Sequence, residues 1–235
     1  MAERIEKYQV INNLFLLSSY FCTMNHRKSI IRNIIFDLGG VLIDLDVAQT
    51  VKAFNELAIP LPADQAELER RAVMYSGIET GTVSLDLFRE AIRELSPLLP
   101  SDDAIDAAWN AMLSDFPEKR VETLQKSGKN YRLFLLSNSN AIHYQFYANR
   151  FKRDYAMEMD SLFEKAYYSF RMNMCKPRPE IFQKALEQSG LLAEETLFID
   201  DTSDNVIAAS ALGIVVHQLM PGQDMVDLFR DGILI

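Results

Sequence analysis

Residues 196–214 read TLFIDDTSDNVIAASALGI, which joins a short apolar run, a pair of aspartates and a helical pattern that ends at a glycine. The run Thr196–Asp201 is continuous and apolar, which is typical of a strand buried on both faces. Asp204–Leu212 has a helical pattern, and Gly213 stands where a left-handed residue would end it. This stretch therefore predicts one strand-to-helix unit of a parallel sheet.

The same pattern recurs elsewhere in the chain. Further apolar runs, each with polar residues at or after its end, are Arg32–Leu38, Arg132–Asn138, Ile214–Leu219 and the shorter Lys165–Phe170. A helix is predicted over Pro179–Ser189, with proline at its first position and Gly190 as its cap. Alternating strands and helices predict an α/β fold, a Rossmann-like parallel sheet with helices on both faces.

A block of helical patterns interrupts this alternation after the first strand. The segments VAQTVKAFNELA, AELERRAVMYSG, LDLFREAIREL and DDAIDAAWNAML contain no buried strand. We therefore expect an N-terminal extension (1–29), a core (30–46 and 116–235) and a helical cap domain (47–115). The aromatic residues expected to pack the cap are Trp109, Phe54, Phe88 and Phe116.

Composition restricts the partners and the compartment. The 235 residues carry 24 Lys plus Arg against 33 Asp plus Glu, a formal charge of -9, so we expect no nucleic-acid and no membrane partner. Cys22 and Cys175 are the only cysteines, which argues against a disulfide framework and fits a reducing compartment. The apolar stretch 11–22 is too short to span a bilayer and lacks a positive leader, and Met24 is an alternative start. We expect a cytoplasmic protein, and its oligomeric state stays open.

Polar side chains stand where the predicted strands end, and one lysine precedes the helix at Pro179. In open parallel sheets these ends meet at one crevice. Carboxylates gathered there repel one another, which a divalent cation with oxygen ligands relieves, most plausibly Mg²⁺. A phosphoryl group suits such a site, because the metal and a lysine neutralise its oxygens while a carboxylate attacks phosphorus. The residues concerned are Asp37, Ser137, Asn138, Lys176, Asp200 and Asp201.

Four stretches, in order, resemble the motifs of the haloacid dehalogenase-like hydrolase superfamily: FDLGGVL, LLSNSN, CKPRPEIF and FIDDTSDNVIAASALGI. The resemblance implies that Asp37 forms an aspartyl-phosphate, that Ser137 binds phosphate and that Lys176 steadies the charge. It also implies a magnesium site made by Asp37, the Gly39 carbonyl and the acidic pair, with Asp201 the direct ligand and Asp200 beside it. Asn138 is expected to bind substrate beside Ser137.

Gly39 departs from the family pattern, because most phosphatases of the family carry there an aspartate that protonates the leaving oxygen. Losing such an acid costs about 10²- to 10⁴-fold in rate unless the leaving group departs easily or another acid substitutes. A sugar 1-phosphate has a weakly basic leaving oxygen, and DLGGVLIDLD resembles the branch that dephosphorylates glucose 1-phosphate. Substitute acids within reach are Asp44, Asp46, Glu79 and His143, although Asp46 is more simply the N-cap of the next helix.

Other functions stay open at this level. A haloacid dehalogenase would use the same aspartate on carbon, but it needs no metal and leaves the acidic pair unexplained. A catalytically silent regulator or scaffold is the second alternative, since Gly39 lacks an acid. A dinucleotide-binding protein is disfavoured because DLGGVLID lacks G-x-G-x-x-G. The preferred prediction is a magnesium-dependent phosphatase acting on a small phosphorylated metabolite.

Overall fold

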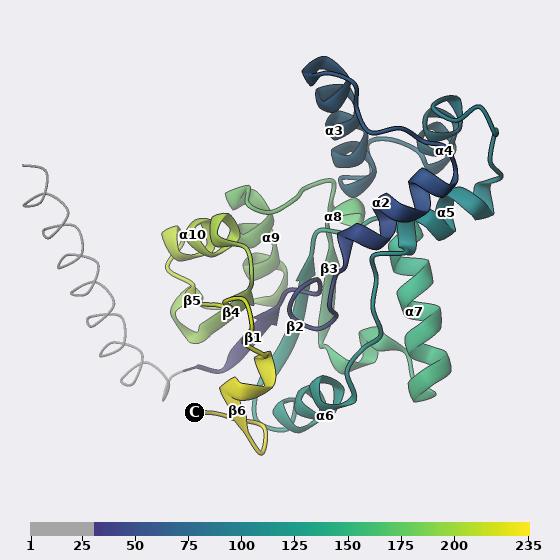
Figure 1. Cartoon of the computed structure of the whole chain (residues 1–235). Helices are drawn as coiled ribbons and strands as arrows, with labels where there is room; N and C mark the ends of the chain where they lie inside the picture. The colour runs from purple at the N-terminus through teal and green to yellow at the C-terminus, as the bar shows by residue number, and fades with distance from the viewer. Residues whose placement is uncertain (1–30) are drawn as a thin grey trace, which may run out of the picture.

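A five-stranded parallel sheet forms the centre of the computed structural model, which describes residues 31–235 (Figure 1). The strand order is β3-β2-β1-β4-β5, and every neighbouring pair is parallel. The Rossmann-like α/β prediction is therefore confirmed. The strands are β1 (Asn33–Phe36), β2 (Arg132–Ser137), β3 (Lys165–Tyr168), β4 (Thr196–Asp200) and β5 (Val215–Gln218).

The predicted extension 1–29, with Cys22, Met24 and His26, lies outside the described residues. Within 31–235, no helix is long and apolar enough to cross a membrane.

The alternation of side chains along β1 divides the core into two layers. Ile34 and Phe36 belong to one apolar cluster, together with side chains of α6 (Glu118–Ser127) and α7 (Ala141–Tyr155). Ile35 belongs to the other, with side chains of α9 (Pro179–Ser189) and α10 (Ser203–Ala211). Helices thus cover both faces, as a strand buried on each side requires.

Helix ends follow the local sequence. Pro179 starts α9, and Gly190 ends it with a φ of 59°, as predicted. The Asp46 carboxylate accepts a hydrogen bond from the Ala48 amide and caps the next helix, which confirms that interpretation. The short elements that complete the chain are α8 (Ser169–Met172), β6 (Phe229–Arg230), β7 (Ile233–Leu234) and the 3-10 turns Met159–Leu162, Ala193–Glu195 and Met225–Leu228.

Four helices occupy the region after β1 and lie beside the sheet in Figure 1: α2 (Val47–Glu56), α3 (Gln65–Glu79), α4 (Leu85–Glu94) and α5 (Asp102–Asn110). They share an apolar cluster that includes Phe88 and Trp109, with Phe54 packed against it. Ile142 of α7 enters the same cluster, so the helical block packs directly on the core.

Phe116 was expected in that block and lies elsewhere. Its ring packs edge-on against Phe151 of α7, with 4.9 Å between centroids, in the sheet-side cluster. The chain has already returned from the helical block at this point, because the incoming and outgoing segments pair before Phe116. The Asp46 amide donates to the Met112 carbonyl at 2.9 Å, and the Ser114 amide donates to the Asp44 carbonyl at 3.1 Å.

Candidate functional site

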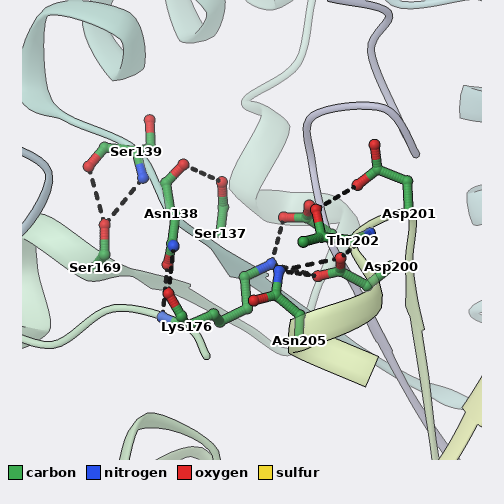
Figure 2. A network of polar contacts seen from close by, with 10 residues as sticks. Ser137, Asn138, Ser139, Ser169, Lys176, Asp200, Asp201, Thr202 and Asn205 are labelled. Carbon is green, nitrogen blue, oxygen red and sulfur yellow. Dashed lines mark hydrogen bonds and ion pairs between the residues drawn. The ribbon is translucent and has the colours of Figure 1, made fainter. Parts of the chain in front are cut away.

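A cavity of about 320 Å³ opens where β1 and β4 end. Its lining includes Asp37, Gly39, Asn138, Lys176 and Asp201, so residues from all four sequence motifs meet there. Parallel strands bring their carboxyl ends to one edge of the sheet, which is why segments up to 164 positions apart converge. Part of this polar network is drawn in Figure 2.

Lys176 joins two of the carboxylates. Its Nζ lies 2.7 Å from Asp37 Oδ1 and 2.7 Å from Asp200 Oδ2, and the ammonium is fully buried. Burial by itself lowers the pKa of Lys176, but Asp37 and Asp200 more than offset that effect and raise the pKa above its ordinary value. The lysine therefore stays charged, as a group that neutralises an anion must.

Asp37 is held in a different electrostatic balance. The pKa of Asp37 is raised to about 7, because burial raises it strongly, the charge of Lys176 lowers it and the nearby charge of Asp200 raises it. One lysine thus compensates two buried carboxylates only in part. A further cation at the site would favour the ionised, nucleophilic form of Asp37.

Asp200 is anchored within the protein. Its carboxylate accepts from the Thr202 amide at 2.8 Å and from Asn205 Nδ2 at 3.1 and 3.0 Å, in addition to Lys176 (Figure 2). Asp200 is fully buried and does not line the cavity. These contacts occupy both oxygens, so Asp200 is better placed to position Lys176 than to bind a ligand directly. Asn205 was not singled out by the sequence, although it stands within the fourth motif.

Asp201 is exposed and faces the turn after Asp37. A Cβ atom added at Gly40 would lie 2.2 Å from Asp201 Oδ2, and Gly40 has a φ of +73°. Only glycine leaves room for the carboxylate and also adopts that conformation without strain. The Thr202 hydroxyl donates to Asp201 Oδ1 at 3.2 Å, which steadies the side chain.

The turn itself is closed by backbone bonds to Leu38. Its carbonyl accepts from the Leu42 amide at 2.8 Å and the Ile43 amide at 3.0 Å. Among the described residues, the Gly39 carbonyl accepts none of the backbone hydrogen bonds of this turn. It is available to a cation, as the resemblance implies.

Leu45 stands beside Gly39. A Cβ at Gly39 would lie 2.7 Å from Leu45 Cδ1, and Leu45 lines the cavity. An apolar side chain therefore occupies the space next to the position where the family usually carries its acid. The sequence gives no signal of this contact, because it depends on how the turn folds back.

Asn138 and Ser137 differ in how they relate to the cavity. Asn138 Nδ2 donates to the Lys176 carbonyl at 2.9 Å, and its Oδ1 accepts from the Lys176 amide at 2.8 Å (Figure 2). This pair fixes the backbone of Lys176. Ser137 is buried, and its hydroxyl lies 3.4 Å from the Asn138 carbonyl, a long hydrogen bond. Their predicted contacts with substrate stay predictions.

Three of the four substitute acids are engaged elsewhere. Asp44 pairs with Arg120 at 2.9 Å, and Asp46 caps α2. The ring of His143 is buried, lies 2.8 Å from Asn110 Oδ1 and stacks on Trp109, and burial lowers its pKa to about 4. The remaining candidate, Glu79, makes no side-chain hydrogen bond or ion pair within residues 31–235, and burial raises its pKa.

Among the described residues, Cys175 is a free and partly buried cysteine, and the acidic group that could hold a metal includes neither His143 nor His217.

The carboxylate group fits a divalent cation. Asp37, Asp200 and Asp201 each offer one oxygen, and these oxygens lie within 4.8 Å of one another. Because Mg²⁺ binds oxygen at about 2.1 Å, such a group needs only small adjustments to share one ion. Asp37, Asp201 and the Gly39 carbonyl are the donors with room to do so.

The chain matches haloacid dehalogenase-like hydrolases over residues 31–213. Two relatives are phosphatases. The D-ribitol-5-phosphate phosphatase of Bacteroides thetaiotaomicron is 27% identical over 194 residues, covering 83% of this chain and 94% of the relative. The sesquiterpene phosphatase of Aspergillus oryzae is 32% identical over 184 residues, covering 77% of this chain and 86% of the relative.

A solved structure shows the same fold with ligands. The HAD family enzyme of Bacteroides thetaiotaomicron, crystallised as the wild-type protein with magnesium and inorganic phosphate, is 36% identical with a TM-score of 0.77. The match covers 85% of this chain and all of that one. Together with the matched residues 31–213, these similarities show that the chain belongs to the family of haloacid dehalogenase-like hydrolases.

Proposed function

We propose that the protein is a magnesium-dependent phosphatase that hydrolyses a small phosphomonoester through an aspartyl-phosphate on Asp37. The observation that carries the proposal is the Lys176 ammonium, which is buried between Asp37 and Asp200 at a cavity that Asp37, Lys176 and Asp201 line. A cation held next to a buried carboxylate suits a dianionic group placed for attack. The two phosphatase relatives and the magnesium and phosphate complex of a similar enzyme support the same class and cofactor.

In the proposed reaction, the Asp37 carboxylate attacks phosphorus while the bond from phosphorus to the leaving oxygen breaks, and the leaving oxygen takes a proton from water. A second water then hydrolyses the aspartyl-phosphate to inorganic phosphate and the free carboxylate. Lys176 neutralises the phosphoryl oxygens and holds Asp37 in place. Asn138 and Asp200 position Lys176, one through its backbone and the other through its ammonium. Asp37, Asp201 and the Gly39 carbonyl would hold Mg²⁺, which would supply further charge neutralisation for the phosphoryl group.

The substrate class follows from the missing acid. Because Gly39 supplies no proton donor and Leu45 stands beside it, an ester with a weakly basic leaving oxygen reacts most readily. A sugar phosphate such as glucose 1-phosphate meets that condition. The polyol phosphate named for the relative at 27% identity has a more basic leaving oxygen, so it tests this condition directly. Glu79 is the alternative source of a proton.

The test is Mg²⁺-dependent turnover of a panel of esters, with sugar 1-phosphates and 6-phosphates compared side by side. Ribitol 5-phosphate belongs in the panel, and so does an apolar phosphate ester, because one relative is named for a sesquiterpene. We expect the rate to fall steeply as the leaving oxygen becomes more basic. A flat dependence that becomes steep in Glu79→Gln would show instead that Glu79 protonates the leaving group.

The two alternative functions, a catalytically silent scaffold and a dehalogenase, predict different results in these assays. A silent scaffold would hydrolyse no phosphate ester, p-nitrophenyl phosphate included. A dehalogenase would release halide from a 2-haloacid without Mg²⁺. Both phosphatase relatives favour phosphorus over carbon as the atom that Asp37 attacks.

A further inference from the structure

A second cavity, also of about 320 Å³, lies within the helical block. Its wall comes from α2, the α2–α3 connection, α3 and Trp109 at the end of α5, and it includes Val47, Val51, Phe54, Ile59 and Leu68. It is a separate hollow from the one that contains Asp37. A space of this size holds roughly ten non-hydrogen atoms, if each takes about the volume of a water molecule.

The wall carries no free charge. Arg71 is its one charged side chain, and that guanidinium pairs with Glu67 and donates to the Pro60 carbonyl at 2.7 Å. The Thr50 hydroxyl is engaged on both sides, donating to the Trp109 carbonyl and accepting from the Met112 amide. Two buried donors, Arg71 Nε and Trp109 Nε1, lack an acceptor among the described residues. Unmatched donors disfavour a cation, and the apolar wall disfavours a polyol.

The rim of this cavity exposes apolar side chains to water. Val47, Val51 and Leu68 are 57%, 39% and 49% exposed. Apolar side chains gathered at the mouth of an apolar hollow are typical of a ligand site. The cavity also begins close to the phosphate site along the chain, because Leu45 lines the Asp37 cavity and Val47 lines this one.

We propose that this cavity receives the apolar carbon chain of a phosphate ester whose phosphoryl group lies at Asp37. The inference rests on the proposed phosphatase function for the phosphate end and adds a second substrate class, esters of unbranched or branched apolar alcohols. Their basic leaving oxygens depart slowly at this site, and the advantage of these esters comes from binding of the apolar chain. Sugar phosphates would place their hydroxyl groups outside the cavity, where water remains.

A homologous series of n-alkyl phosphates, from butyl to decyl, tests the proposal with Mg²⁺ present. Each methylene that leaves water is expected to raise kcat/KM about threefold to fourfold, until the cavity is full and the increase stops. A constant kcat/KM along the series in the wild-type protein would overturn the inference.

A matched pair of variants on α3 localises the effect. Leu68→Asp places a charge on the rim, and the dependence on chain length is expected to disappear. Val73→Asp makes the same kind of change on the same helix, at a side chain that is 72% exposed and outside the cavity. It is expected to keep the wild-type dependence. If kcat/KM depends on alkyl length equally in the two variants, the alkyl chain of the substrate does not bind in this cavity.

Binding can be followed without catalysis, because Trp109 is the only tryptophan of the chain and lines the cavity. Titration with n-alkanols is expected to change its fluorescence saturably, with tighter binding for longer chains. If no ester is hydrolysed while the alkanols bind, the phosphatase proposal fails, but the assignment of this cavity as a site for an apolar carbon chain stands. If esters are hydrolysed without preference for length and the alkanols do not bind, only the cavity assignment fails.

Discussion

At the scale of single residues, Lys176 controls the charge balance of the site, since it is the ammonium shared by two buried carboxylates. Lys176→Ala leaves Asp37 and Asp200 without that counter-charge and removes a donor to the phosphoryl oxygens. We expect kcat to fall by roughly 10²-fold or more. The exposed Lys152→Ala is the matched control and is expected to keep wild-type turnover, measured with p-nitrophenyl phosphate. Comparable activity of the two variants would contradict the role of Lys176.

Gly40 offers a separate test of the metal site. A methyl group at Gly40 collides with the Asp201 carboxylate and also strains a left-handed backbone. Gly190→Ala isolates the backbone effect, because Gly190 has a φ of +59° with nothing within 4 Å of the added atom. Both variants are expected to lose about 1–2 kcal/mol of stability.

Only Gly40→Ala is expected to raise the half-saturating Mg²⁺ concentration, by about 10- to 100-fold, since it displaces a residue expected to bind the metal. Magnesium titrations of phosphatase activity measure this difference. An unchanged requirement for Mg²⁺ in Gly40→Ala would show that Asp201 is not a ligand.

At the scale of elements, α7 joins the sheet to the helical block. His143 of α7 donates from Nδ1 to Asn110 and stacks on Trp109, with 5.3 Å between centroids. Burial lowers the pKa of His143 from 6.5 to about 4, so the folded protein holds the neutral ring. Between those values the unfolded chain binds the proton more readily, and acidification therefore reduces the free energy of unfolding.

Between pH 7 and pH 5, His143 is expected to lower the free energy of unfolding by about 2 kcal/mol, because one titrating group changes it by at most about 1.4 kcal/mol per pH unit. Urea unfolding of the wild-type protein and His143→Gln at both pH values measures it. The variant should lose less stability on acidification, because it has no proton to gain at that position. The same loss in both proteins would mean that His143 titrates normally in the fold.

The strands and α9 were predictable, because apolar runs and the proline and glycine at helix ends are local properties. The acidic residues of the site could be predicted from the same apolar runs, because each of these residues stands at or just after the end of a strand. Phe116 and Leu45 were not predictable in this way. Which cluster Phe116 joins is decided by Phe151, and the contact of Leu45 with Gly39 is decided by a turn. Both depend on packing between segments that the local pattern does not encode.

At the scale of the whole molecule, the site couples metal binding to stability. Three carboxylates lie together and one lysine pairs with two of them, so the folded protein is expected to gain from a bound cation that the unfolded chain does not hold. At a Mg²⁺ concentration of about 100 times Kd, the gain is about 2.7 kcal/mol. For a chain of this size that corresponds to a Tm increase of roughly 5–10 °C over protein in EDTA. Asp201→Asn is expected to lose most of the increase, and a Tm independent of Mg²⁺ would argue against the site.

The central claim is covalent chemistry at Asp37, and trapping the enzyme during turnover tests it most directly. Protein quenched in acid while it hydrolyses p-nitrophenyl phosphate with Mg²⁺ is digested and analysed by mass spectrometry. We predict one added phosphoryl group on the peptide that contains Asp37, and in Asp37→Asn neither that group nor turnover. A phosphoryl group on another residue, or full activity in Asp37→Asn, would contradict the account.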